Sequence, residues 1–155
     1  MKIMLFVLFA YSLTTSVYGA TVGSVVLSGA VPKVVSVTVT GQGVYNNLDL
    51  TTTQVNLLVA NVQEQSNDSL GYKVSVASLN AGQLKNGTSG LVYTAKYNGT
   101  GFTLTTPGVQ VTTQGAQTAV VSVVRPLTIS YTGVPYVSML SGVYTDTLTV
   151  TIIAN

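Results

Sequence analysis

Residues 20–40, ATVGSVVLSGAVPKVVSVTVT, carry the pattern that decides the fold. Apolar residues alternate with small or polar ones along this stretch, and the alternation is broken once, at Pro32. A period of two residues is typical of a β-strand, whose side chains point in turn to opposite faces. Proline cannot donate a hydrogen bond to a sheet, so it marks a position where strand pairing changes or ends. The stretch is therefore predicted to form two strands in series, one on each side of Pro32.

The same alternation continues through the rest of the chain, and helical periodicity is scarce. Clear strands are predicted at residues 34–40, 55–62, 72–79, 91–97, 119–124, 127–131 and 143–153, with weaker ones at 48–52, 102–105 and 109–112. Residues 54–64 also match helical spacing, but the strand interpretation is preferred there. Turn-forming residues such as Asn80-Ala81-Gly82, Asn86-Gly87 and Asn98-Gly99 separate the strands. Strands about ten residues apart with such turns predict one all-β domain, a two-sheet sandwich.

The first 19 residues have the pattern of a secretory signal peptide. Lys2 supplies a positive start, residues 3–13 an apolar stretch, and Val17-Tyr18-Gly19 a small-residue cleavage site. An apolar stretch of this length is too short for a membrane helix, which needs about 20 residues. We therefore expect cleavage after Gly19, export, and a mature chain that begins at Ala20 and has no membrane span.

Charge and cysteine content narrow the class of protein further. Only 6% of the residues are charged, and the net charge of +2 falls to +1 once Lys2 is removed. The remaining cations stand singly along the chain: Lys33, Lys73, Lys85, Lys96 and Arg125. Nucleic-acid binding needs clustered Lys and Arg, so it is not expected. Because cysteine is absent, an exported domain must be held by its core and its sheet hydrogen bonds.

Few residues are candidates for catalysis or metal binding. The absence of His and Cys removes the commonest general base, the thiolate nucleophile and the usual ligands of zinc and copper. A glycosidase needs two carboxylates about 5 to 9.5 Å apart. Asp49 is expected at a strand start, Glu64 and Asp68 beside a loop, and Asp146 in the last strand, which brings no two together. We predict no catalytic residue, metal or cofactor, and a hydrolase built on these carboxylates is the third hypothesis for function.

The strand before Pro32 leaves two hypotheses open. One face carries Val25, Leu27, Gly29 and Val31, and is more apolar than the other, which carries Ser24, Val26, Ser28 and Ala30. In the first hypothesis residues 22–31 fold back as the domain's own first strand, which the alternation alone slightly favours. In the second they pair with the open edge of a neighbouring molecule and fill its core, and repetition gives a head-to-tail fibre.

The end of the chain favours the second hypothesis. Residues 141–152, SGVYTDTLTVTI, resemble the closing strand of chaperone–usher pilins and of spore coat protein U-like domains, in which Gly-x-Tyr-x-Asp leads into alternating apolar residues. The strand before Pro32 is similar to the donor strand of those pilins, especially the cysteine-free ones. The resemblance covers the two ends of the chain and the general strand pattern.

The resemblance implies an incomplete immunoglobulin-like sandwich over residues 33–155, preceded by a donor-type strand at residues 20–32. The donor residues would be Val25, Leu27, Gly29 and Val31, and the edge of the receiving groove would be formed by Tyr144, Leu148, Val150 and Ile152. The implied partners are copies of the chain or related subunits, a periplasmic chaperone that lends a strand, and an outer-membrane usher. The chain would then be a structural subunit of a pilus or fimbria that supports adhesion at the cell surface. The alternative is a self-complete secreted sandwich that binds a surface glycan or an envelope protein through its tyrosines.

Overall fold

The structure is a computed structural model that describes Gly19 and residues 21–155. The predicted signal peptide, residues 1–19, therefore lies outside the described residues except for Gly19. The described part includes no helix with the length and apolar character that crossing a membrane requires. The chain divides between Val31 and Pro32 into two units, which are taken in turn below.

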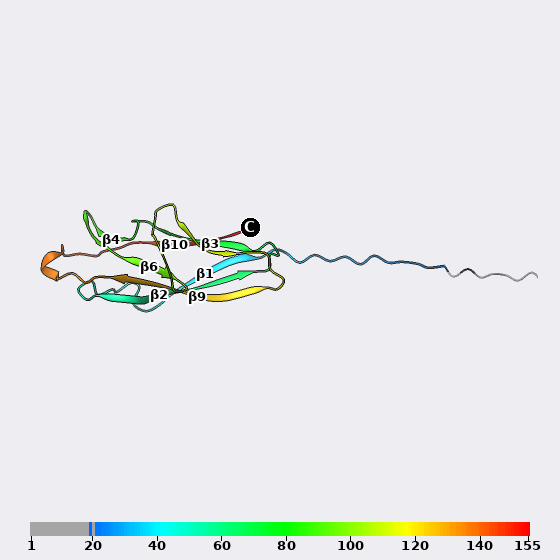
Figure 1. Ribbon diagram of the computed structural model, residues 1–155, viewed down its shortest axis with the longest axis horizontal. Coiled ribbons are helices and arrows are strands. Elements are labelled where there is room, and N and C mark those ends of the chain that lie inside the picture. Colours follow the sequence, from blue (N-terminus) through cyan, green and yellow to red (C-terminus); the bar gives the residue numbers. More distant parts are fainter. Residues whose placement is uncertain (1–18, 20) are drawn as a thin grey trace, which may run out of the picture. The chain divides into compact units, whose positions relative to one another are not determined.

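The unit that begins at Pro32 is an all-β sandwich, which confirms the predicted fold class (Figure 1). The larger sheet has the strand order β1 (Val35–Gly41), β2 (Gln54–Ser66), β9 (Val121–Tyr131), β6 (Thr94–Tyr97) and β7 (Thr100–Phe102). The second sheet has the order β10 (Leu148–Ala154), β3 (Tyr72–Ser78) and β8 (Val109–Gln114). A hairpin of β4 (Gln83–Asn86) and β5 (Ser89–Val92) and a 3₁₀ helix, η1 (Tyr136–Ser138), complete the unit. Pairing between the described strands is antiparallel throughout.

The core lies where the inward faces of the strands meet. Along β3 the side chains alternate between buried and half-buried, and Tyr72, Val74 and Val76 are completely buried. The rest of the core comes mainly from β2, β6 and β9, and includes Val62, Leu127 and the following residues: Val59, Ala60, Ala95, Tyr97, Ile129 and Tyr131. The alternation in the sequence therefore identifies most of these inward faces, and it breaks in β2, where the adjacent Val59 and Ala60 are both buried at a register shift.

Two of the predicted strands have different bounds in the structure. Residues 91–97 are divided between β5 and β6 at Tyr93, whose N–H donates to the carbonyl of Gly82 at 2.9 Å. Residues 119–124 and 127–131, predicted as separate strands, form the single strand β9, which contains Pro126. The carbonyl of Pro126 accepts from the N–H of Asn98 at 2.9 Å, on the side where β6 has already ended. The proline nitrogen faces the same side, so no sheet hydrogen bond is lost there.

Other predicted strands are replaced by turns or are absent. Residues 48–52 include a turn but no strand, and the last strand begins at Leu148, not at Val143. Residues 54–64 are strand and not helix, because β2 pairs on both sides, with β1 and with β9. The predicted turns at Asn86-Gly87 and Asn98-Gly99 do join hairpins, and Asn98 has the positive φ of 49° that such turns require.

The described residues of the N-terminal unit form no strand. Residues 21–31 run as an extended chain in Figure 1 and take part in no sheet. The large apolar side chains of this segment, at Val22, Val25, Val26, Leu27 and Val31, are 85–93% exposed. The structure therefore describes no strand over residues 22–31, and the partner of this segment stays a prediction.

Candidate functional site

Strands β1 and β10 are edge strands of the two main sheets, as β7 and β8 are at the other edges, and each has a partner on one side only among the described strands. The strand β1 lies at the edge of the larger sheet and pairs with β2, and β10 lies at the edge of the smaller sheet and pairs with β3. These two edge strands contact each other across the sandwich. The unpaired N–H and C=O groups of an edge strand are a template for pairing with a further strand.

The register of β10 shows which of its main-chain groups face the open edge. The N–H of Asn155 donates to the carbonyl of Gly71 at 3.1 Å, next to the β3 side of the strand. Main-chain groups alternate in direction along an antiparallel strand, so the odd-numbered residues face β3. The N–H and C=O groups of Leu148, Val150 and Ile152 consequently point to the open edge.

The same reasoning applies to β1. The carbonyl of Val34 accepts from the N–H of Asn67 at 3.0 Å, on the β2 side. The main-chain groups of Val35, Val37 and Val39 therefore point away from β2, to the open edge. Both edges thus combine unpaired main-chain groups with apolar side chains at the same positions.

These apolar side chains are incompletely covered. In β10, Leu148, Val150 and Ile152 are half-buried although they pack against the core, and Val39 in β1 is 48% exposed. These residues combine partly exposed apolar side chains with unpaired main-chain groups. An added strand would cover the side chains and pair with the main-chain groups.

A cavity of about 440 Å³ lies between the two edge strands. Its lining is mostly apolar and comes from β1, β10 and the core behind them: Val39, Gly41, Val59, Ala60, Leu127, Ile129, Leu148 and Val150. We call this cavity, together with the open edges of β1 and β10, the groove.

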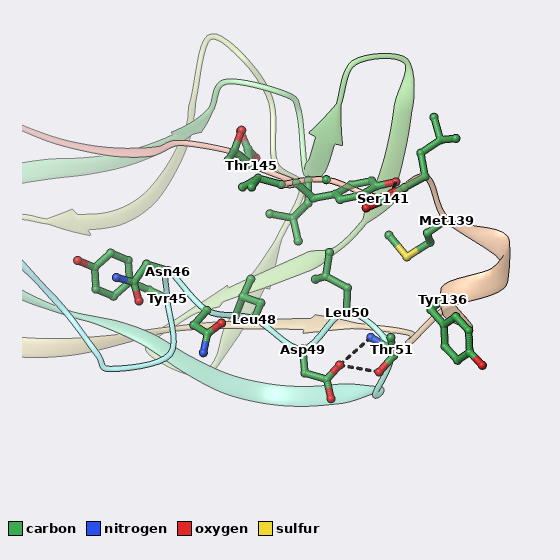
Figure 2. A pocket seen from close by; sticks show the side chains of 17 residues that line it. Tyr45, Asn46, Leu48, Asp49, Leu50, Thr51, Tyr136, Met139, Ser141 and Thr145 are labelled. Atoms are coloured by element: carbon green, nitrogen blue, oxygen red, sulfur yellow. Dashed lines mark hydrogen bonds between the residues drawn. The ribbon is translucent and has the colours of Figure 1, made fainter.

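The groove continues at one end into a second cavity of about 900 Å³ (Figure 2). The two cavities share the lining residues Tyr45, Leu48, Leu84 and Asp146. In Figure 2, Leu48 and Leu50 point into the hollow, whereas the carboxylate of Asp49 points away from it. Asp49 instead accepts hydrogen bonds from the N–H and hydroxyl of Thr51, at 2.9 and 2.6 Å. The cavity therefore extends the groove with a lining of both apolar and polar residues.

Asp146 fixes the start of β10 at this end of the groove. One carboxylate oxygen accepts from the hydroxyls of Ser78 and Tyr93, at 2.6 and 2.5 Å, and the other accepts from the N–H of Asn80 at 2.9 Å. Burial, and then the hydrogen bond to this carboxylate, raise the pKa of Tyr93 well above its usual value. Asp146 therefore ties the start of β10 to the end of β3, a role that the sequence did not reveal.

Glu64 has a different place from the one predicted. It lies within β2 and is completely buried, not beside a loop. Its carboxylate accepts from the hydroxyls of Tyr72 and Tyr97, at 2.8 and 2.6 Å, and from Nε of Arg125 at 2.9 Å. Burial, and then the hydrogen bond to Glu64, raise the pKa of Tyr72 to about 12 and that of Tyr97 still further. With three donors directed at it, this carboxylate forms a structural ion pair inside the core.

The structure brings some of the predicted site residues together and leaves others apart. Leu148, Val150 and Ile152 lie on the open edge of β10. Tyr144 precedes that strand, lines the second cavity and shares a hydrogen bond of 2.8 Å with the hydroxyl of Ser89. The predicted donor residues all belong to the exposed N-terminal segment: Val25, Leu27, Gly29 and Val31. The sequence prediction missed the second wall of the groove, which β1 supplies, although the alternation of Val35, Val37 and Val39 signals it.

No protein-family model matches the chain, and no curated protein matches its sequence. Over Gly19 and residues 21–155, no three His, Cys, Asp or Glu side chains gather where they could hold a metal ion. The groove, with its open edges and its apolar lining, is the feature that any functional hypothesis must explain.

Proposed function

We propose that this chain is the exported subunit of a bacterial surface fibre, and that each copy donates residues 22–31 to the groove of the next. The proposal rests on one observation: β1 and β10 are both edge strands and border the same apolar groove. A strand added there would pair with main-chain groups of β10 and cover side chains of both edges. The partners implied by the resemblance to pilins, a periplasmic chaperone and an outer-membrane usher, belong to the same proposal, as does a role in adhesion.

The order of the strands supports this interpretation. A seven-strand immunoglobulin-like sandwich has strands A, B, E and D in one sheet and C, F and G in the other. The order β1, β2, β9, β6 corresponds to A, B, E, D, and the pair β3 and β10 corresponds to C and F. The place of strand G, on the open side of β10, has no strand among the described residues. In this interpretation the groove is the place of the seventh strand.

The N-terminal segment has the properties of a donor. Val25, Leu27 and Val31 share one face and are at least 85% exposed, and Gly29 on that face allows close backbone approach. Burying a Val or Leu side chain completely contributes about 1.5–3 kcal/mol. Three such side chains, with the main-chain hydrogen bonds of a strand, can hold subunits together without any catalytic step. The self-complete sandwich has less support, because residues 21–31 take part in no sheet.

A matched pair of variants tests the proposal. Leu27 and Val26 are equally exposed, at 90%, but neighbouring residues of an extended segment point to opposite faces. In the mature chain, residues 20–155, we expect Leu27→Asp to stop assembly, since it would place an unpaired charge in the groove. Val26→Asp should leave assembly largely unchanged. Size-exclusion chromatography would show a ladder of multimers for the parent chain and Val26→Asp, and monomers for Leu27→Asp.

A second measurement examines the receiving side. The Leu27→Asp chain keeps its groove, so it should bind a synthetic peptide of residues 20–32 with one peptide per chain. A parent chain that stays monomeric under all conditions, together with a peptide that does not bind, would contradict the proposal.

A further inference from the structure

One end of the sandwich carries an apolar patch that the core does not use. The long loop between β9 and β10 exposes four large apolar side chains, each at least 63% exposed: Tyr136, Val137, Leu140 and Val143. Several large apolar side chains exposed on one loop are a candidate surface for a partner. We call these four residues the loop-end patch.

The opposite end of the sandwich is where the N-terminal segment joins the body. The side-chain amide of Asn67 donates to the carbonyl of Pro32 at 2.8 Å, and its oxygen accepts from the N–H of Val34 at 2.7 Å. The body therefore begins directly at Pro32, with no linker after Val31. Leu70 and Val120 are exposed near this point, which we call the Asn67 end.

The direction of an incoming strand decides which ends of two copies meet. The strand β10 begins at Leu148, after the loop that carries the patch, and ends at Ala154. The N–H of the next residue, Asn155, donates to the carbonyl of Gly71 beside the Asn67 end. A donor parallel to β10 would bring its own body to the acceptor's Asn67 end, where the acceptor's own N-terminal segment starts. A donor antiparallel to β10 would bring its body to the loop-end patch and leave the Asn67 end available. Only the antiparallel direction repeats as a head-to-tail fibre.

We propose that the loop-end patch docks against the Asn67 end of the donor copy, so that successive bodies contact each other as well as exchanging a strand. This inference rests on the proposed function. If Val31 of the donor lies at the mouth of the groove, the anchored Pro32 follows at one residue's distance, about 3.4 Å along an extended chain. The absence of a linker thus brings the two bodies into contact.

The composition of the two ends suits this contact. The loop-end patch is continuous with the groove, because Leu140 and Val143 line the second cavity, which shares Leu48 with the groove. Leu70 and Val120 of the donor copy supply apolar side chains to meet it. The occupant of the patch is therefore a second copy of this chain, and the expected fibre is stiff at its joints.

Two disabled chains isolate a single joint. The Leu27→Asp chain receives but does not donate, and a Val150→Asp chain donates but does not receive, so their mixture forms one pair and no fibre. We expect Leu140→Asp in the receiving chain to weaken the pair by about tenfold or more, because the aspartate would be buried at the joint. Leu70→Asp in the donating chain should have a similar effect. Analytical ultracentrifugation measures both affinities.

The control is Val124→Asp in the receiving chain, a residue on β9 with 60% exposure, close to the 63% of Leu140. It should leave the affinity of the pair unchanged. The peptide of residues 20–32 carries no body, so Leu140→Asp should weaken the pair far more than it weakens binding of the peptide to the receiving chain. If the peptide binds and the pair is as tight with Leu140→Asp and Leu70→Asp as without them, the docking inference is wrong while strand donation stands. If the peptide itself does not bind, the proposed function fails, and the docking inference with it.

Discussion

Strands β3 and β10 are neighbours in one sheet, have similar apolar residues, and differ in how completely those residues are covered. In register, Val76 lies opposite Val150 and Val74 opposite Ile152. Both valines of β3 are completely buried, whereas Val150 and Ile152 are half-buried. The strand β3 has a partner on each side, and β10 has one only among the described strands.

The comparison shows that the burial of an apolar side chain depends on whether its strand is paired on both sides, and not on the sequence of that strand. A side chain on the inward face of an edge strand lacks contacts on the side where the next strand would lie. That deficit repeats along both β1 and β10, and the two deficits face the same cavity. One added strand would cover both edges, which is why we propose that the groove is where this chain receives its partner.

The largest effect is expected inside the core, from Glu64→Leu. The substitution would leave the hydroxyls of Tyr72 and Tyr97 and the charge of Arg125 without their acceptor inside the core. We expect the free energy of unfolding to fall by about 3–5 kcal/mol, as when one partner of a buried ion pair is removed. Urea unfolding of the Leu27→Asp chain measures this without interference from assembly.

The control for that variant is Gln65→Leu, at the next position of β2, where the side chain is exposed. Its effect should stay within about 0.5 kcal/mol. If Glu64→Leu lowers the free energy of unfolding by less than about 1 kcal/mol, the stability of the core does not depend on this ion pair.

The cross-strand pair of Val76 and Val150 tests the comparison itself. Val76→Ala should cost about 2–3 kcal/mol of unfolding free energy, since the side chain is completely buried. Val150→Ala should cost less than about 1 kcal/mol in the Leu27→Asp chain, but should weaken binding of the peptide of residues 20–32. Equal costs for the two substitutions in the unbound chain would show that β10 is as well covered as β3.

Asp146 joins the fully covered strand β3 to the open-edged strand β10, and Asp146→Asn tests how far the two strands depend on this link. The amide keeps the shape but weakens the charge-assisted hydrogen bonds from Ser78 and Tyr93. We expect a loss of about 1–2 kcal/mol in unfolding free energy, together with weaker peptide binding because the start of β10 is less well fixed. Urea unfolding and a peptide titration measure the two effects. Unchanged peptide binding would mean that Asp146 stabilises the fold but does not affect the groove.

The smallest effect is a loss of stability at alkaline pH. The pKa of Tyr72 is raised to about 12 in the folded chain, by burial and by Glu64, and that of Tyr97 is raised further. In the unfolded chain both ionise near the ordinary pKa of about 10, so the unfolded state loses protons first. The stabilisation is complete below about pH 10 and declines as the pH rises through the folded pKa values.

Unfolding midpoints from about pH 8 to about pH 11 measure that decline. A chain with Tyr72→Phe and Tyr97→Phe should show a shallower slope, because the two groups no longer titrate. An equal slope in both chains would assign the alkaline loss to other groups.

The sequence was sufficient for the all-β class and for most inward faces, because alternation is a local property. Val62, Val74 and Val76 show this, since each lies in a predicted strand of alternating pattern and each is completely buried. Strand ends were less predictable. Pro126 lies inside β9 because β6 ends one residue away, which is a tertiary fact that no local pattern contains.

The candidate site was partly predictable for the same reason. Leu148, Val150 and Ile152 were identified by parity and by resemblance, but the opposing wall in β1 requires knowledge of how the two sheets pack. The role of Glu64 was missed because a lone acidic residue in a strand pattern gives no sign of its partners. Arg125, Tyr72 and Tyr97 come from three other strands and meet it only in the folded chain.

Amide hydrogen exchange of the Leu27→Asp chain, alone and with the peptide of residues 20–32, tests the central claim most directly. The N–H groups of Thr149 and Thr151 face β3 and should be protected in both states. Those of Val150 and Ile152 face the open edge, so they should exchange quickly in the free chain and become protected when the peptide binds. Protection of Val150 and Ile152 in the free chain, or a bound peptide that leaves them unprotected, would contradict the account.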